Sequence, residues 1–140
     1  MISMIKDWQR QQELKKTLKP FWQEVSKNLE LFYVMDQRQV IDHIFTMAQW
    51  EKTKQLPKIE FSDVIQQYVS SLEEFNRVFI DFKSFEKWYS GDAQRKTREN
   101  AQQLHAKKAL VSETFKTLRP ILEQAKETLT QRLLTIGVLK

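Results

Sequence analysis

The strongest constraint on the fold is a regular spacing of large apolar residues between positions 61 and 82. Steps of four and three residues alternate along the series Phe61, Ile65, Tyr68, Leu72, Phe75, Phe79 and Phe82. This alternation places all of them on one face of an α-helix, because about 3.6 residues make one turn. The spacing predicts a helix over residues 62–90 with a heptad seam. Ser62 is its expected N-cap, and Gly91 its expected left-handed C-terminal residue.

A second series with the same spacing occupies the last third of the chain. Its members are Ala101, Leu104, Lys108, Val111, Phe115, Leu118, Leu122, Ala125 and Leu129. This series predicts a helix over residues 93–136 that Asp92 caps and Gly137 ends. Pro120 lies inside it, and we expect a kink there because proline removes one intrahelical hydrogen bond and clashes with the preceding turn.

The N-terminal third carries a shorter series of this kind, made of Leu18, Trp22, Val25, Leu29 and Phe32. It predicts helical structure over residues 3–35. Pro20 leaves two arrangements open. Either one helix passes Pro20, or Pro20 is the first residue of a new helix, where its missing N–H costs no hydrogen bond.

The apolar pattern moves to a different face after residue 35. Asp36 and Gln39 have the spacing of a capping box, in which the N-cap side chain and the side chain three residues later each bind a backbone N–H. Met35 and Val40 flank them at the positions of a hydrophobic staple. Together these residues predict that one helix ends here and that another spans residues 37–55.

Turn-forming residues are scarce in this chain. Its 140 residues include 2 Gly and 3 Pro, which leaves room for only a few connections between long elements. Pro57 marks the clearest connection, a loop over residues 56–61. No stretch alternates apolar and polar residues as a strand does. We therefore expect one all-α domain over residues 1–140: an elongated antiparallel bundle of four to five helices with coiled-coil-like heptad seams in the last two.

The residue types that catalysis and metal binding require are missing or wrongly spaced. The chain has no Cys, and its two glycines cannot build a Gly-rich phosphate loop. Neither His43 nor His105 has the Glu-x-x-His partner of a helical di-iron site. Asp42 is expected at the surface, and His43 at a helix boundary beside Trp50. We expect no enzyme, no catalytic residue, no cofactor and no metal site.

The chain has no feature of a membrane or exported protein. No 18 apolar residues run together, and the N-terminal stretch lacks the apolar core of a signal peptide. The absence of cysteine suits a reducing compartment. We expect a cytoplasmic location and no membrane association.

Three aromatic residues occupy positions that a slender bundle cannot easily cover. Trp8 lies on the weakest part of the N-terminal helical stretch, and Trp88 and Tyr89 lie at a helix end. Exposed aromatic side chains often mark an interface. These three residues are the candidate contacts to a protein partner or to a second copy of the chain.

The basic residues are concentrated in the last third. Residues 92–140 carry 10 basic and 5 acidic side chains, whereas residues 57–91 carry 4 and 6. Residues 94–108 are the most basic stretch, with few apolar positions, and hold the candidate phosphate contacts Arg95, Lys96, Arg98, Lys107 and Lys108. Cations on one helix bind nucleic acid by releasing its counterions, although most charge runs are only solvated helix faces.

The sequence thus favours a non-enzymatic interaction or assembly subunit that acts through protein–protein contacts. The alternative is a nucleic-acid-associated helical protein that uses the basic start of the last helix.

Overall fold

The computed structural model describes residues 2–54 and 62–139, and their regular structure is entirely helical, which confirms the all-α class. The α-helices are α1 (Ile2–Arg38), α2 (Ala48–Thr53), α3 (Asp63–Ser90), α4 (Arg98–Lys116) and α5 (Leu118–Thr135), and a short 3-10 turn, η2, spans Ala93–Arg95. The expected loop over residues 56–61 lies outside the described residues.

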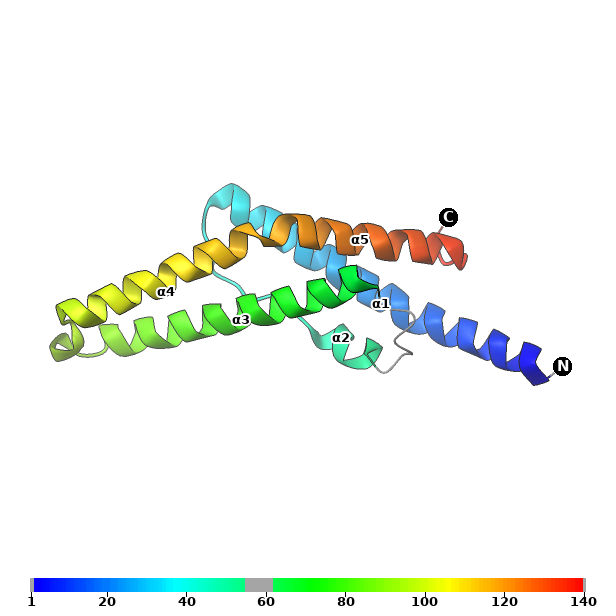
Figure 1. Cartoon of the computed structure of the whole chain (residues 1–140), viewed down its shortest axis with the longest axis horizontal. Helices are drawn as coiled ribbons and strands as arrows, with labels where there is room; N and C mark the ends of the chain where they lie inside the picture. The colour runs from blue at the N-terminus through cyan, green and yellow to red at the C-terminus, as the bar shows by residue number, and fades with distance from the viewer. Residues whose placement is uncertain (1, 55–61, 140) are drawn as a thin grey trace.

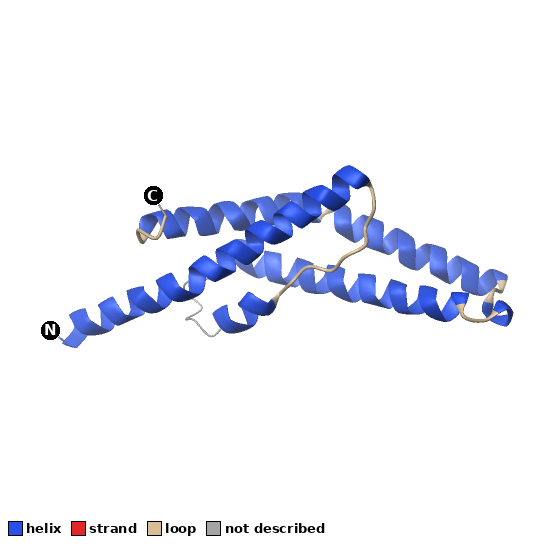
Figure 2. Ribbon diagram, turned by 180° about the vertical axis from the view of Figure 1, so that it is seen from behind, coloured by secondary structure: helices blue, strands red, loops and turns tan. Residues whose placement is uncertain are grey.

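The helices form an elongated molecule with two different ends (Figure 1). At one end α3 and α4 run antiparallel and side by side, without a third helix beside their outer halves. We call this two-helix projection, residues 82–110, the arm. Towards the other end α1 and α5 pack antiparallel, and the N-terminal turns of α1 extend beyond the end of α5 (Figure 2).

Aromatic rings join the helices where the arm meets the rest of the molecule. Phe32 of α1 stacks on Phe115 of α4 with ring centroids 4.5 Å apart. Phe75 of α3 lies 6.0 Å from Phe115 and 5.2 Å from Phe45. All four rings are buried, so this cluster holds three helices and the α1–α2 connection together.

The apolar series of α3 faces inward along the whole helix. The six described members, Ile65 to Phe82, are buried, whereas Phe61 lies outside the described residues. Ser62 takes the N-cap position with an extended backbone, although its side chain makes no capping hydrogen bond. The expectation for Gly91 is wrong: its φ of −78° and ψ of −15° are right-handed helical values, so no left-handed residue ends α3.

The register expected for the start of the last helix is also wrong. The predicted seam includes Ala101 and Lys108, but both are exposed. The half-buried positions of this segment are Asn100, Leu104 and Lys107, and Val111 is the first fully buried residue. Alanine and lysine differ little in hydrophobicity from the other residues of this segment. Their spacing alone therefore could not predict which face of α4 packs on α3.

The predicted long helix over residues 93–136 is divided into η2, α4 and α5. Asp92 caps η2 by accepting a hydrogen bond from the Gln94 N–H, and Thr97 caps α4 through the Asn100 N–H. The break before Pro120 falls at Thr117, where α4 ends and α5 begins. Pro120 is the third residue of α5, where its backbone nitrogen lacks an intrahelical partner in any case.

Gly137 ends α5 as expected, with a φ of +80°. The Gly137 N–H donates to the Leu134 carbonyl and the Val138 N–H to the Leu133 carbonyl, which is the Schellman pattern of a helix C-terminus.

Helix α1 is continuous over 37 residues, with Pro20 inside it, which settles the two arrangements left open for this proline. Downstream of the proline, Trp22 is half-buried and its indole N–H donates to Thr130 Oγ1 at 2.9 Å. This contact fixes α1 against α5.

The capping box expected at Asp36 is wrong, because Asp36 lies in the last turn of α1. Gln39 adopts a left-handed φ of 55°, its N–H donates to the Asp36 carbonyl, and the Val40 N–H donates to the Met35 carbonyl. These bonds form a second Schellman motif, so residues 36–40 end a helix instead of starting one. The helix expected over 37–55 is only α2, which begins at Ala48.

Candidate interaction surfaces

The connection between α1 and α2 is held by two asparagine side chains from different helices. Asn76 of α3 accepts from the Phe45 N–H and donates to the Phe45 carbonyl, both at 2.9 Å. Asn28 of α1 binds Thr46 in the same paired way, at 3.2 and 3.0 Å. Each side-chain amide thus pairs with both backbone hydrogen-bonding groups of one residue, in a segment that has no regular secondary structure.

Two further polar side chains complete this buried cluster. Glu24 is 5 % exposed, and its Oε2 accepts from the Gln49 N–H at 2.9 Å near the start of α2. Tyr68 OH accepts from Asn28 Nδ2 at 2.8 Å. Burial raises the pKa of the Tyr68 hydroxyl far above its usual value, because desolvation penalises the phenolate. The cluster therefore combines a neutral hydroxyl, two amides and the carboxyl group of Glu24, whose Oε1 is buried without a hydrogen-bond partner among the described residues.

Sequence reasoning missed this cluster because its members lie far apart along the chain. Asn28 and Asn76 bind backbone 18 and 31 residues away. The available signal was the position of Glu24 and Asn28, one turn apart and next to the buried Val25 and Leu29. Polar residues inside an apolar face usually have a buried partner.

Asp42 and His43 form an exposed pair in this connection, not on a helix. His43 Nδ1 lies 2.7 Å from Asp42 Oδ1, with 61 % of the His43 side chain exposed. The hydrogen bond from His43 holds the pKa of Asp42 below its usual value. Across the described residues, no three His, Asp or Glu side chains come close enough to share a metal ion.

An open groove of about 560 Å³ lies between the start of α3 and the end of α5. Its lining consists of Ser62, Ile65, Thr128, Leu129, Gln131, Arg132 and Thr135. It offers a single ionisable side chain, Arg132, and so has no acid–base pair for proton transfer.

Three apolar side chains project from the first turns of α1. Met4, Ile5 and Trp8 are 73, 57 and 63 % exposed, and from Met4 onwards the first buried residue is Leu14. Trp8 follows Ile5 by three residues and Met4 by four, so its side chain neighbours both of them on the helix surface. Trp8 is thus exposed to solvent, as a residue that contacts a partner protein must be in the isolated chain.

The other two interface candidates are partly covered within the chain. The Trp88 ring packs against Phe85 at 5.5 Å, and the Arg95 guanidinium lies 5.1 Å from its centroid. Arg95 also donates to the Trp88 carbonyl at 2.8 Å. Trp88 remains 43 % exposed, whereas Tyr89 is half-buried. Arg95 and Trp88 therefore close the end of the arm.

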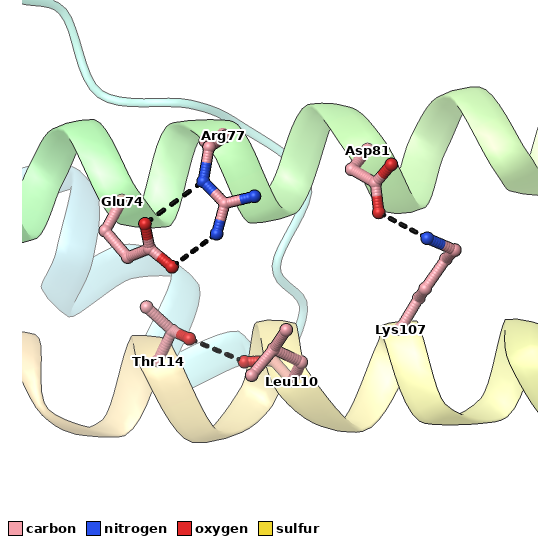
Figure 3. Close-up of polar contacts among 6 residues, drawn as sticks. All are labelled: Glu74, Arg77, Asp81, Lys107, Leu110 and Thr114. Atoms are coloured by element: carbon pink, nitrogen blue, oxygen red, sulfur yellow. Dashed lines mark hydrogen bonds and ion pairs between the residues drawn. The ribbon is translucent and has the colours of Figure 1, made fainter.

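The five basic candidates divide into two groups. Arg95 is bound to Trp88, and Lys107 forms an ion pair with Asp81 at 2.6 Å that links α4 to α3 (Figure 3). Lys96, Arg98 and Lys108 are exposed and form no ion pair with any residue the structure describes. Nearby on α3, Arg77 is held by Glu74, and this hydrogen bond lowers the pKa of the Glu74 carboxyl.

Comparisons with known proteins do not place this chain in a family. No protein-family model matches it, and neither curated proteins nor solved structures include a significant match. Among the residues described, no helix is long and apolar enough to cross a membrane.

Proposed function

We propose that this chain is a non-enzymatic assembly subunit that binds a second copy of itself through the first turns of α1. The observation that supports the proposal is the exposed group Met4, Ile5 and Trp8 on a helix that continues past its own core. We call this group the α1 patch.

The chemistry of the α1 patch suits a protein interface. Tryptophan and methionine are enriched at interfaces relative to the rest of the surface. A projecting helix end can pack against the same helix end of another copy. In such a two-fold arrangement, the α1 patch of each copy covers the α1 patch of the other. The arm is a weaker candidate, since Arg95 and Phe85 already cover much of Trp88.

Sedimentation velocity of the wild type and of Trp8→Ala tests this function. We expect the wild-type mass to rise above 16.9 kDa as the concentration increases. Truncation of a central interface tryptophan typically costs about 2 kcal/mol or more, which is about 30-fold in affinity. Trp8→Ala should therefore stay monomeric over the range in which the wild type associates.

Leu110→Ala is the matched control, because Leu110 is an apolar residue of the arm with 46 % exposure. It should associate like the wild type. A wild-type mass that stays at 16.9 kDa at every concentration, or equal loss of association in both variants, contradicts the proposal.

A further inference from the structure

The arm carries exposed cations that form no ion pair within the described part of the chain. Lys96, Arg98 and Lys108 are exposed and without an ion pair to any described residue, and we call these three the basic stripe. Of the three acidic residues of the arm, Glu86 pairs with Lys83, Asp92 caps η2, and Glu99 is an exposed residue of the first turn of α4 for which the described residues show no ion pair.

Two members of the basic stripe, Arg98 and Lys108, lie on one face of α4, and Lys96 lies two residues before this helix begins. Arg98, Ala101, His105 and Lys108 recur at steps of three, four and three residues, so they share a helix face. The side of α4 that packs on α3 is instead formed by Leu104, Lys107 and Val111. The register change described above therefore moves Lys108 out of the seam and onto the face that carries Arg98.

This face has no large apolar side chain. Ala101 is its only apolar member, and His105 and Gln102 are exposed polar neighbours. A protein interface normally has a buried aromatic or aliphatic anchor, and a helix that lies in a membrane surface inserts large apolar residues. A face of cations, alanine and polar side chains fits neither of these partners.

We propose that the basic stripe binds the phosphate backbone of nucleic acid without reading its sequence. From Arg98 to Lys108 the helix rises about 15 Å, and each strand of a duplex places a phosphate about every 3.4 Å along the duplex axis, so this helix face can reach more than one phosphate. The face has no aromatic ring for stacking on bases, so the contact is electrostatic. Lys96 and Arg98 also stand near the positive end of α4, where an anion relieves an unfavourable interaction with the helix dipole.

Fluorescence anisotropy with a labelled 20-base-pair DNA duplex tests this proposal on the full chain. Three phosphate contacts predict a slope of about −2.7 for the logarithm of affinity against the logarithm of salt concentration. The affinity should then fall about 40-fold between roughly 50 and 200 mM salt, and two duplexes of unrelated sequence should bind equally.

Charge reversal of the stripe should abolish this binding. The variant carries Lys96→Glu, Arg98→Glu and Lys108→Glu, and its matched control carries Lys6→Glu, Lys16→Glu and Lys19→Glu on α1. All six residues are exposed and both variants change the net charge equally. The control should bind the duplex within about threefold of the wild type, and both variants should keep the circular dichroism spectrum and melting temperature of the wild type.

Three results overturn the proposal. The first is no binding of the wild type to duplex at 50 mM salt, and the second is an equal loss in both variants, which indicates a general charge effect. The third is stripe-dependent binding of phosphatidylcholine–phosphatidylserine vesicles that is as tight as duplex binding, which assigns the stripe to anionic lipid.

Discussion

Residue 39 shows how one backbone angle changes the meaning of a sequence motif. Asp36 and Gln39 have the letters of a helix start, yet the left-handed φ of Gln39 and the two hydrogen bonds around it end α1. A residue with a Cβ pays a conformational cost in this region that glycine avoids. The surrounding packing, and not an intrinsic preference of Gln39, therefore stabilises the left-handed conformation at this position.

Gln39→Gly is expected to stabilise the protein by about 0.5–1 kcal/mol, the relief of left-handed strain less the added entropy of glycine in the unfolded chain. Asp36→Ala should change stability by less than about 0.5 kcal/mol, since a carboxylate in the last turn of a helix has no favourable dipole interaction to lose. Urea unfolding measures both. A loss of about 1 kcal/mol in Asp36→Ala would restore the capping-box interpretation.

Among the elements, the best predicted is α3. Its large aromatic and aliphatic residues differ clearly from the residues of its polar face. The apolar spacing therefore predicts both the helix and the side of it that is buried. In α4 the first half offers alanine, lysine and one leucine, and the seam was placed one position away from Asn100 and Lys107. The expected nucleic-acid face accordingly included Lys107 and Arg95, which the structure uses for internal contacts.

The extended connection between α1 and α2 could not be predicted from local pattern. Val40, Ile41 and Ile44 have the spacing of one helix face, but the segment is not helical, and Asn28 and Asn76 of other helices bind its backbone. Such long-range bonds leave little trace in neighbouring residues. The sequence signal for these bonds is the position of Asn28 within the apolar face of α1, where a buried amide needs a hydrogen-bond partner.

Asn76→Ala should destabilise the protein by about 2–3 kcal/mol, because it leaves the N–H and the carbonyl of Phe45 without their partners beside a buried ring. Gln66→Ala, an exposed position of the same helix, is the control and should cost less than about 0.5 kcal/mol. Urea midpoints at an unchanged m-value compare the two. Equal effects would show that the amide does not hold the connection.

The whole molecule has one continuous core and two ends with different surface chemistry. The core runs from Leu14 to Leu133 and takes in every α-helix. At one end the α1 patch is apolar, and at the other the arm carries the basic stripe. Because both lie outside the core, either surface can be altered without removing a buried residue.

This separation makes the central claim, assembly through the α1 patch, testable apart from folding. Deleting residues 2–9 removes Met4, Ile5 and Trp8, and among the side chains described from residue 4 onwards burial begins only at Leu14. The shortened chain should keep the melting temperature of the full chain within about 3 °C.

The most direct measurement is sedimentation equilibrium of this shortened chain beside the full chain. We predict that the full chain associates as its concentration rises, while the shortened chain remains a folded monomer. A shortened chain that is folded and still associates like the full chain would contradict the account.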